Sequence, residues 1–221
     1  MASNSNLQLR QRLDAAVPRG ISISTPIFAA RAENAELWDG EGRRYIDFAG
    51  GIAVINVGHR HPRVMAAVRA QLDAFTHTCF QITPYEVYVR LAERLNDLAP
   101  GTSLKKTALF STGAEAIENA VKIARYATGR PAIISFSGAF HGRTMMALSL
   151  TGKINPYKAG FAPFMPEVFH APFPDAYRGP SAGDSIAAIE TLMRSSVEPS
   201  RVAAILIEPV QGEGGFNVAP F

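Results

Sequence analysis

Residues 107–136 read TALFSTGAEAIENAVKIARYATGRPAIISF, and this stretch decides the fold class. Its first four residues, 107–110, are typical of a strand, and apolar residues at helical spacing follow over 114–127. A second short apolar run over 132–136 again predicts a strand. A strand, a helix and a strand in direct succession indicate the repeating unit of an α/β domain.

The same alternation continues towards the last residues of the chain. Residues 184–193 predict another helix, and residues 203–207 form a nearly all-apolar run, as expected of a strand that is buried on both faces. The stretch 151–183 is rich in proline, glycine and aromatic residues and is too long for a simple connection. We therefore predict an α/β domain with a largely parallel sheet.

The amino-terminal part of the chain follows a different pattern. Residues 1–30 are polar and then interrupted by prolines, which indicates an arm that becomes ordered by docking. Apolar residues flank a glycine-containing turn over 35–48, which predicts a β-hairpin. Pro62 suits the first position of a helix, and apolar residues recur at helical spacing from there to Phe75.

Composition excludes several classes of protein. Of the 221 residues, 47% are apolar and 19% are charged, so the chain can bury a sizeable core and is not disordered. The net charge of +3 comes from scattered basic residues, which gives little reason to expect nucleic acid as a partner. Cys79 is the single cysteine, and there is neither a membrane-length apolar run nor a secretory signal. We expect a soluble, cytoplasmic protein with no membrane or nucleic-acid partner.

The tripeptide Ser111-Thr112-Gly113 joins the first predicted strand to the helix. Glycine lets the backbone turn tightly there, and the first N–H groups of the helix then face outward, where they favour an anion such as phosphate. Thr112 and Glu115 also have the spacing of a capping box, which any turn of this kind can use. The run alone leaves both interpretations open.

The run SFSGAFHGRT, residues 135–144, starts within the second predicted strand and continues beyond it. Phe140 and His141 lie between two glycines, so a flat ring can be presented on an uncluttered turn, and Arg143 offers a planar fork that suits a carboxylate. An aromatic ring packed under a loop beside a solvated arginine is the alternative interpretation. Ser137 lacks the glycine context of a nucleophile elbow, which argues against a hydrolase.

Two glutamates follow the predicted strand over 203–207. Glu208 and Glu213 therefore lie beyond its carboxyl end, where open α/β sheets bind ligands. Gly212-Glu213-Gly214 begins like a dinucleotide fingerprint, but Asn217 occupies the position of the third glycine, so NAD is not expected. The five histidines show no zinc-binding spacing, and we predict no metal site.

Taken together, these runs closely resemble the class III (ω-amino) aminotransferases, which use pyridoxal 5′-phosphate (PLP). The resemblance extends from about Arg19 to the last residue. The blocks AFHGRT and IEPVQGEGG are shared with acetylornithine aminotransferases. The blocks THTCFQ, AIENAVKIAR and LTGKINPYKAGFAPFMPEVFHAPFP are similar to the 4-aminobutyrate aminotransferases in particular. The resemblance implies a fold-type I PLP-dependent transferase that moves the amino group of 4-aminobutyrate to 2-oxoglutarate. The alternatives are another ω-amino donor such as acetylornithine, or a non-catalytic truncated module.

The resemblance also implies a role for each candidate residue. Four residues would bind the cofactor: Gly113, Ala114, Phe140 and His141. Four would line the substrate pocket: Ile52, Arg143, Glu208 and Glu213. The N–H groups of Gly113 and Ala114 would bind the phosphate, and the Phe140 ring would stack on the pyridine ring. Arg143 would bind a substrate carboxylate, and in the family the counterpart of Glu213 pairs with an arginine further along the chain.

The family places its Schiff-base lysine, and the aspartate that binds the pyridinium nitrogen, well after the Gln-Gly-Glu-Gly block. None of the five lysines has that context, so we assign no catalytic residue and expect roughly the first half of such an enzyme. The expected parts are an arm and hairpin of the small domain (1–60) and the first part of the large PLP-binding domain (61–221). In the resembled fold, strands of the other half separate the strand at 107–110 from the rest. Relatives form homodimers or dimers of dimers, which we expect of the intact protein.

Overall fold

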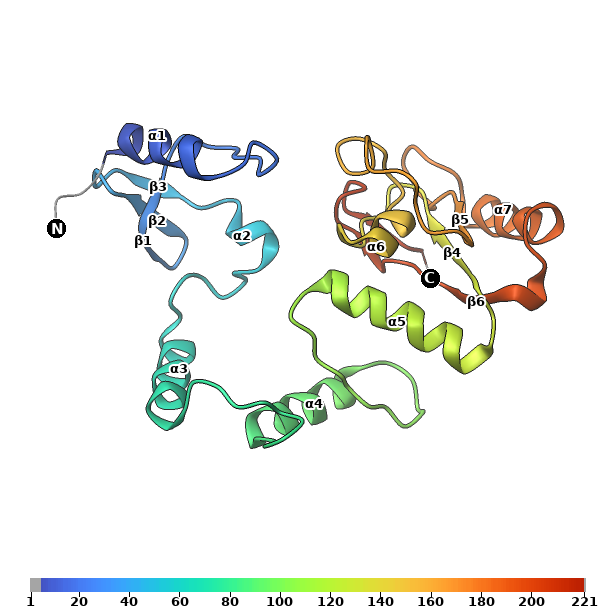
Figure 1. The fold of residues 1–221 in the computed structure, drawn as a ribbon, viewed down its shortest axis with the longest axis horizontal. Coiled ribbons are helices and arrows are strands. Elements are labelled where there is room, and N and C mark those ends of the chain that lie inside the picture. The colour runs from blue at the N-terminus through green and yellow to red at the C-terminus, as the bar shows by residue number, and fades with distance from the viewer. Residues whose placement is uncertain (1–4, 221) are drawn as a thin grey trace. The chain divides into compact units, whose positions relative to one another are not determined.

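The computed structural model describes residues 5–220, and these residues form two compact units (Figure 1). One unit runs up to Val89 and the other starts at Arg90, and each is described by itself. Within the described residues, no helix has both the length and the apolar character needed to cross a membrane.

The first unit is built on a three-stranded antiparallel sheet in the order β1-β2-β3. Its elements are α1 (Asn6–Ala16), β1 (Ala29–Glu33), β2 (Glu36–Asp39), β3 (Arg44–Ile46), α2 (Gly50–Ala53) and α3 (Pro62–Ala74), while α4 (Glu86–Leu98) runs across the boundary between the units. Strands β2 and β3 pair Leu37 with Tyr45, which confirms the predicted hairpin. The helix predicted from Pro62 is α3, and Pro62 occupies its first turn.

The amino-terminal arm is ordered on this hairpin. It contains α1, a helix that was not predicted, with a capping box between Ser5 and Gln8. The buried Asn6 side chain donates to Asp39 Oδ2 at 2.9 Å, and the Asn6 backbone N–H donates to Glu41 at 2.7 Å. The first four residues of the expected arm lie outside the described residues.

The second unit has a three-stranded parallel sheet in the order β5-β4-β6. Its elements are α5 (Gly113–Thr128), β4 (Ala132–Phe136), α6 (Met145–Leu150), β5 (Val168–Ala171), α7 (Ala182–Ser195), a 3₁₀ turn (Pro199–Arg201), β6 (Val202–Ile205), β7 (Val210–Gln211) and β8 (Asn217–Val218). The predicted α/β class and parallel sheet are confirmed.

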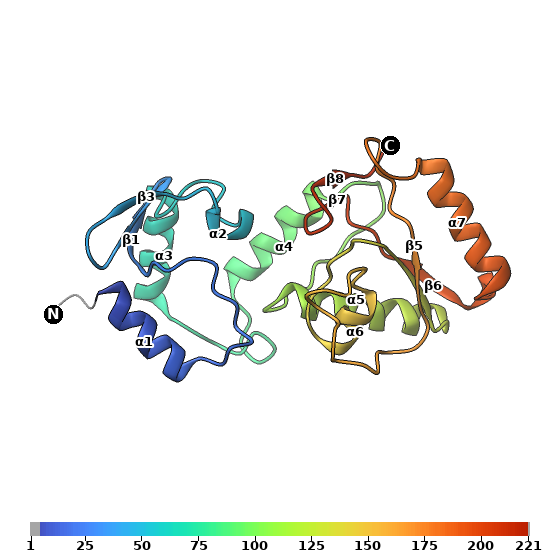
Figure 2. The ribbon, with the colours of Figure 1, turned by 90° about the horizontal axis from the view of Figure 1, so that it is seen from above.

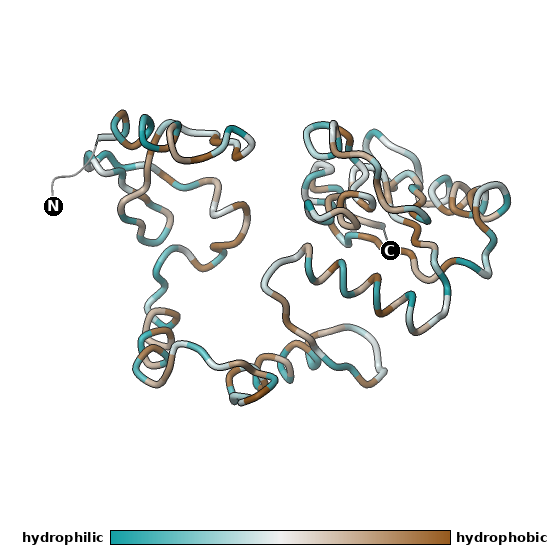
Figure 3. Tube along the Cα trace, viewed as in Figure 1, coloured by the Kyte–Doolittle hydropathy of each residue, from teal (hydrophilic) through white to brown (hydrophobic). Residues whose placement is uncertain are grey.

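Helices cover both faces of this sheet, as Figure 2 shows. On one face, Ile134 and Phe136 pack with Ile189 and Leu192 of α7. On the other face, Ile133 packs with apolar residues of α5 and α6. Apolar and polar residues alternate around α5 (Figure 3), which explains how one side of this helix packs on the sheet while the other faces solvent.

Two predictions about this unit were wrong. Residues 107–110 form no strand, and the described parallel sheet consists of β5, β4 and β6 without them. Strand β6 lies at the edge of the sheet and Ile205 is 46% exposed, so it is not buried on both faces. The stretch 151–183, expected to be more than a simple connection, contains the parallel strand β5.

Candidate active site

The carboxyl ends of β4 and β6 bring two of the predicted runs together. Parallel strands end at the same edge of a sheet, so the loop after Phe136 and the segment after Ile205 are neighbours. The Phe140 backbone N–H donates to Glu208 Oε1 at 2.9 Å, and Glu208 Oε2 accepts from the Gly212 N–H at 3.2 Å. The Glu208 carboxylate therefore links the turn at Phe140 to the segment that carries Glu213 through two hydrogen bonds.

The first turn of α5 lies against the same loop. Gly142 has a φ of +122°, and a β-carbon at this position would lie 2.6 Å from Ala114 Cβ. The two segments therefore approach closely only because residue 142 has no side chain. A β-carbon at Gly113, in contrast, would meet no atom within 4 Å, so the end of the helix is open.

The predicted capping box is present at the start of α5. The Thr112 N–H donates to the Glu115 carboxylate, and the Glu115 N–H donates to Thr112 Oγ1. Among the described residues, no acceptor is in hydrogen-bonding position for the N–H groups of Gly113 and Ala114. The cap and an anion site are thus compatible, because they use different N–H groups.

Phe140 and Arg143 form an aromatic and cationic group with Tyr157. The Phe140 and Tyr157 ring centroids are 4.8 Å apart, and the Arg143 guanidinium lies 5.8 Å and 5.7 Å from them. Within the described part of the chain, the exposed Arg143 has no carboxylate bonded to it. Its N–H donors therefore remain available to a ligand.

His141 is buried directly behind this turn. Its Nε2 lies 3.2 Å from Ser135 Oγ, and Ser135 Oγ donates its hydrogen to the Leu150 carbonyl. Nε2 must therefore carry the hydrogen of this pair, which leaves Nδ1 as the acceptor of a neutral ring. Burial lowers the pKa of His141, and nearby Glu208 opposes that effect.

Glu213 forms an ion pair at the rim of the site. Lys153 Nζ lies 3.0 Å from Glu213 Oε1. Lys153 and then Tyr157 lower the pKa of Glu213, so its carboxylate is charged at neutral pH. Glu213 is thus paired with Lys153 and not with Arg143.

Ile52 is the one predicted site residue that lies in the other unit. It is 92% exposed, and Gly50, Gly51, Ile52 and Ala53 all have positive φ, at 59° for Ile52. Positive φ is unfavourable for a β-branched residue, so this left-handed turn is strained. Asp47 stabilises this turn, because its carboxylate accepts a hydrogen bond from the Gly50 N–H and pairs with His59 at 2.7 Å.

Sequence reasoning missed three residues of the site: Lys153, Tyr157 and Gln211. Gln211 is 2% exposed and donates from Nε2 to the Ser137 carbonyl at 2.9 Å, which fixes the start of the turn. No local spacing connects these residues with the turn. The only signal was their place in the blocks that carried the family resemblance.

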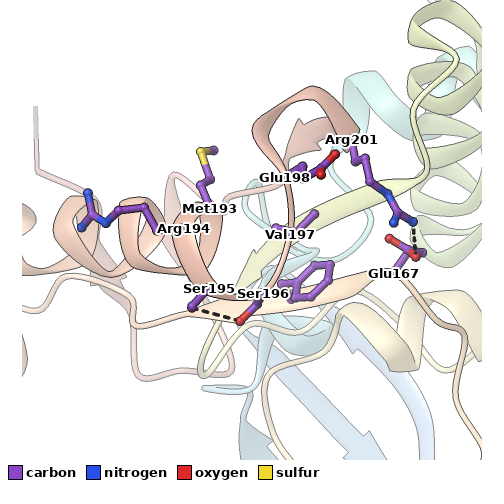
Figure 4. A pocket seen from close by; sticks show the side chains of 9 residues that line it. Glu167, Met193, Arg194, Ser195, Ser196, Val197, Glu198 and Arg201 are labelled. Carbon is purple, nitrogen blue, oxygen red and sulfur yellow. Dashed lines mark hydrogen bonds and ion pairs between the residues drawn. The ribbon is translucent and has the colours of Figure 1, made fainter.

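A pocket of about 370 Å³ lies elsewhere on this unit, where β5 and β6 begin (Figure 4). Its lining residues are Glu167, Phe169, Met193, Arg194, Ser195, Ser196, Val197, Glu198 and Arg201. Open α/β sheets bind ligands at the opposite, carboxyl edge, so we do not assign this pocket to the site. The described residues also contain no cluster of His, Cys, Asp or Glu that could hold a metal ion.

Comparison with known proteins identifies the family. The model of the aminotransferase class-III family matches residues 20–221. The chain belongs to the class-III aminotransferases. It is 55% identical to the 5-aminovalerate aminotransferase DavT of Pseudomonas aeruginosa over 98% of this chain and 51% of the relative. It is also 55% identical to the 4-aminobutyrate aminotransferase GabT of Escherichia coli, over 96% of this chain and 50% of the relative.

Solved structures of aminotransferases match this class-III chain over its whole length. An (S)-enantioselective ω-transaminase from Thermomicrobium roseum has a TM-score of 0.85 at 31% identity, with 100% of this chain and 53% of that chain covered. The taurine:2-oxoglutarate aminotransferase from Bifidobacterium kashiwanohense, in complex with PLP and glutamate, has a TM-score of 0.88 at 25% identity, with 100% and 51% covered. The chain spans about half the length of the curated relatives that it matches, and the predicted family and fold class are confirmed.

Proposed function

We propose that the complete product of the gene encoding this chain transfers the amino group of 4-aminobutyrate to 2-oxoglutarate with PLP. The observation that carries the proposal is the close approach of Gly142 to Ala114. This contact places the open end of α5 next to an aromatic ring and a free guanidinium. The helix end suits a phosphate, the ring suits a heterocycle, and the guanidinium suits a carboxylate.

The residues at the end of α5 fit the phosphate of PLP. The N–H groups of Gly113 and Ala114 have no acceptor among the described residues, and no atom fills the space beside Gly113. The helix dipole favours an anion there by about 1 kcal/mol. Phe140 is half-buried and its ring would pack on the pyridine ring, with His141 behind it. When bound, PLP supplies an electron sink for the transfer of the amino group.

The substrate side is assigned to the groups at the rim. Arg143 would bind the carboxylate of an amino acid or oxo acid as a two-pronged donor. Glu208 positions Phe140 through its backbone N–H, and Glu213 contributes the negative charge that faces the substrate. We also assign Ile52 to the wall of the pocket. The division at residues 60 and 61 into small-domain and large-domain parts and the dimeric state remain predictions.

The donor is assigned from the relatives. The 4-aminobutyrate and 5-aminovalerate aminotransferases are equally similar to this chain, and their named substrates differ by one methylene. Two further relatives at 46% identity are named 4-aminobutyrate aminotransferase (Mycobacterium leprae) and probable 4-aminobutyrate aminotransferase (Bacillus subtilis). A pocket discriminates one methylene by roughly 10-fold or more, so the two donors can be separated by rate.

The test measures glutamate formation by the complete gene product with PLP and 2-oxoglutarate. We expect the ratio kcat/KM to be highest for 4-aminobutyrate when 5-aminovalerate and acetylornithine are compared as donors. A higher ratio for either of the other donors would contradict the substrate assignment and keep the family chemistry. No transfer from any donor, with no PLP bound, would favour a non-catalytic module.

A further inference from the structure

Thr151 has no role in the proposed function, yet its buried side chain contacts the turn that carries Phe140. It is the first residue after α6 and is 0% exposed. The His141 N–H donates to Thr151 Oγ1 at 3.2 Å, and Oγ1 donates to the Ala147 carbonyl at 2.9 Å. Both bonds can form together, because a hydroxyl donates one hydrogen and also accepts. Thr151 therefore supplies the acceptor for the N–H group that follows Phe140.

Gly152 holds the other side of the same turn. Its N–H donates to the Ala139 carbonyl at 2.8 Å, and its carbonyl accepts from the Gly138 N–H at 3.1 Å. A β-carbon at Gly152 would lie 2.6 Å from the Gly138 nitrogen and would overlap the Phe136 carbonyl oxygen. The segment after α6 can approach the turn this closely because residue 152 has no side chain.

These bonds fix both peptide planes that flank Phe140. The plane before Phe140 is held at its carbonyl by Gly152, and at its N–H by Glu208 Oε1 at 2.9 Å. The plane after Phe140 is held at its N–H by Thr151. A peptide group is planar, so two fixed planes determine φ and ψ of the residue between them. The direction of the Cα–Cβ bond of Phe140 is therefore set by the backbone, and this direction decides where its ring is presented.

We infer that Thr151 is a positioning residue for the cofactor, because its hydroxyl fixes one of the two peptide planes that direct the Phe140 ring. The turn is then ordered before PLP binds, so binding does not have to order it. This inference rests on the proposed function, since it takes Phe140 as the residue that packs on the pyridine ring. The alternative is that Thr151 only stabilises the end of α6, because threonine often bonds to the carbonyl four residues earlier.

Substitutions at Thr151 separate these two roles. T151V has nearly the same shape but no acceptor, so the His141 N–H is left buried without a partner. T151S keeps the hydroxyl. The matched control is T128V, because Thr128 Oγ1 donates to the Ala124 carbonyl at 2.7 Å and accepts from the Arg130 N–H at 3.2 Å. Thr128 is exposed and is the last residue of α5, whereas the candidate site lies at the first turn of that helix.

The experiment titrates the cofactor-free complete gene product with PLP and measures affinity from the absorbance of the bound cofactor. The circular dichroism of the same band, at saturating PLP, reports how the cofactor ring lies relative to the protein. We expect T151V to weaken PLP binding about 10-fold and to change the dichroism, whereas T151S and T128V stay close to the wild type. F140A removes the ring that Thr151 positions, so T151V should cause little further loss in the F140A background.

Amide hydrogen exchange over residues 137–142 of the cofactor-free protein gives a second measurement. Exchange should be faster in T151A than in T151S, and this comparison replaces the titration if valine prevents folding. Equal exchange in T151A and T151S would overturn the inference.

The titration can overturn the inference in two further ways. Unchanged PLP affinity and dichroism in T151V would do so, and so would an equal loss with and without the Phe140 ring, which would indicate a structural role only. If the wild type transfers the amino group of 4-aminobutyrate while T151V binds PLP normally, the inference fails and the proposed function stands. If the wild type binds PLP but prefers another donor, the proposed substrate fails and the role of Thr151 stands. A wild type that binds no PLP would overturn both.

Discussion

Gly142 approaches Ala114 so closely that a β-carbon at position 142 would lie 2.6 Å from Ala114 Cβ and 3.0 Å from its Cα. Gly142 also has a φ of +122°, which L-residues rarely adopt. The contact fixes the turn that carries Phe140 to the first turn of α5. The geometry of the whole candidate site depends on it.

We therefore expect Gly142→Ala to destabilise the protein and to weaken PLP binding. The backbone conformation alone costs about 1–3 kcal/mol, and the clash with Ala114 adds to this cost. Thermal unfolding and a PLP titration measure the two effects. Gly129→Ala is the matched control, because Gly129 also has positive φ, at +68°, but a β-carbon there would meet nothing within 4 Å. Equal effects of both substitutions would show that the contact with Ala114 is unimportant.

Glu208→Gln should move the Phe140 turn. Both carboxylate oxygens of Glu208 accept a backbone N–H, from Phe140 and Gly212, and an amide can replace only one of them. Bonds to a charged acceptor contribute about 1.5–3 kcal/mol each, so we expect PLP to bind at least about 10-fold more weakly. Glu190→Gln, on the exposed face of α7, is the control. Unchanged PLP affinity in Glu208→Gln would mean that this bond does not position the ring.

The sequence predicted the local features of the fold well and the non-local ones poorly. Helix α5 and its capping box depend on neighbours three or four residues apart, so Thr112 and Glu115 were sufficient to predict its start. Helix α1 has the same signal in Ser5 and Gln8, which was overlooked because the arm is polar. The strand expected over 107–110 needs a partner strand, and these residues belong to none of the described sheets.

The candidate site, like the fold, depends on both local and non-local features, and only the local ones could be predicted. The runs that contain Phe140 and Glu208 each follow a predicted strand that the structure contains, so their place at one edge of the sheet could be inferred. The contact between Gly142 and Ala114 could not, because it depends on how α5 packs on the loop. Tyr157 reaches the site from a loop whose path no periodicity describes, which is why only the structure revealed its contacts.

Acid should destabilise the first unit through Asp39. Although burial raises the pKa of this carboxyl, hydrogen bonds from Arg43, Asn6 and Tyr45 lower it well below its ordinary value of 3.8. A lowered pKa in the folded state gives stability above pH 3.8 that is lost as the pH falls further. The fluorescence of Trp38, the single tryptophan, reports unfolding of this unit.

The variant Asp39→Asn should remove this pH dependence and lower the unfolding temperature at pH 7. The NH2 group of the new amide would face N–H and O–H donors that now hydrogen-bond to the Asp39 carboxylate, so those bonds would be lost. Asp14→Asn is the control, because Asp14 is exposed and pairs with Arg10 on the same helix, α1. An unfolding curve of Asp39→Asn that matches the control at pH 7 would contradict this account.

Mild acid should act on the second unit through its buried histidines. Burial lowers the pKa of His141 and of His170 below the ordinary value of 6.5. Stability from these neutral rings is complete above pH 6.5 and falls as the pH drops through and below that value. We expect the unfolding temperature to decrease from pH 7 to pH 5 and to decrease less in His141→Gln. The exposed His77 provides the control His77→Gln, which should keep the slope of the wild type.

Substitution of Arg143 should weaken binding of the oxo acid more than binding of the cofactor. Its guanidinium has no bonded carboxylate in the described part of the chain, so it is free to make two charge-assisted hydrogen bonds to 2-oxoglutarate. Losing both in Arg143→Ala should raise KM for 2-oxoglutarate by about 100-fold, with a much smaller change in PLP affinity. Arg143→Lys keeps the charge but not the planar fork, so it should recover only part of the loss. If alanine weakened PLP and oxo acid binding equally, Arg143 would be supporting the Phe140 turn and not holding a substrate.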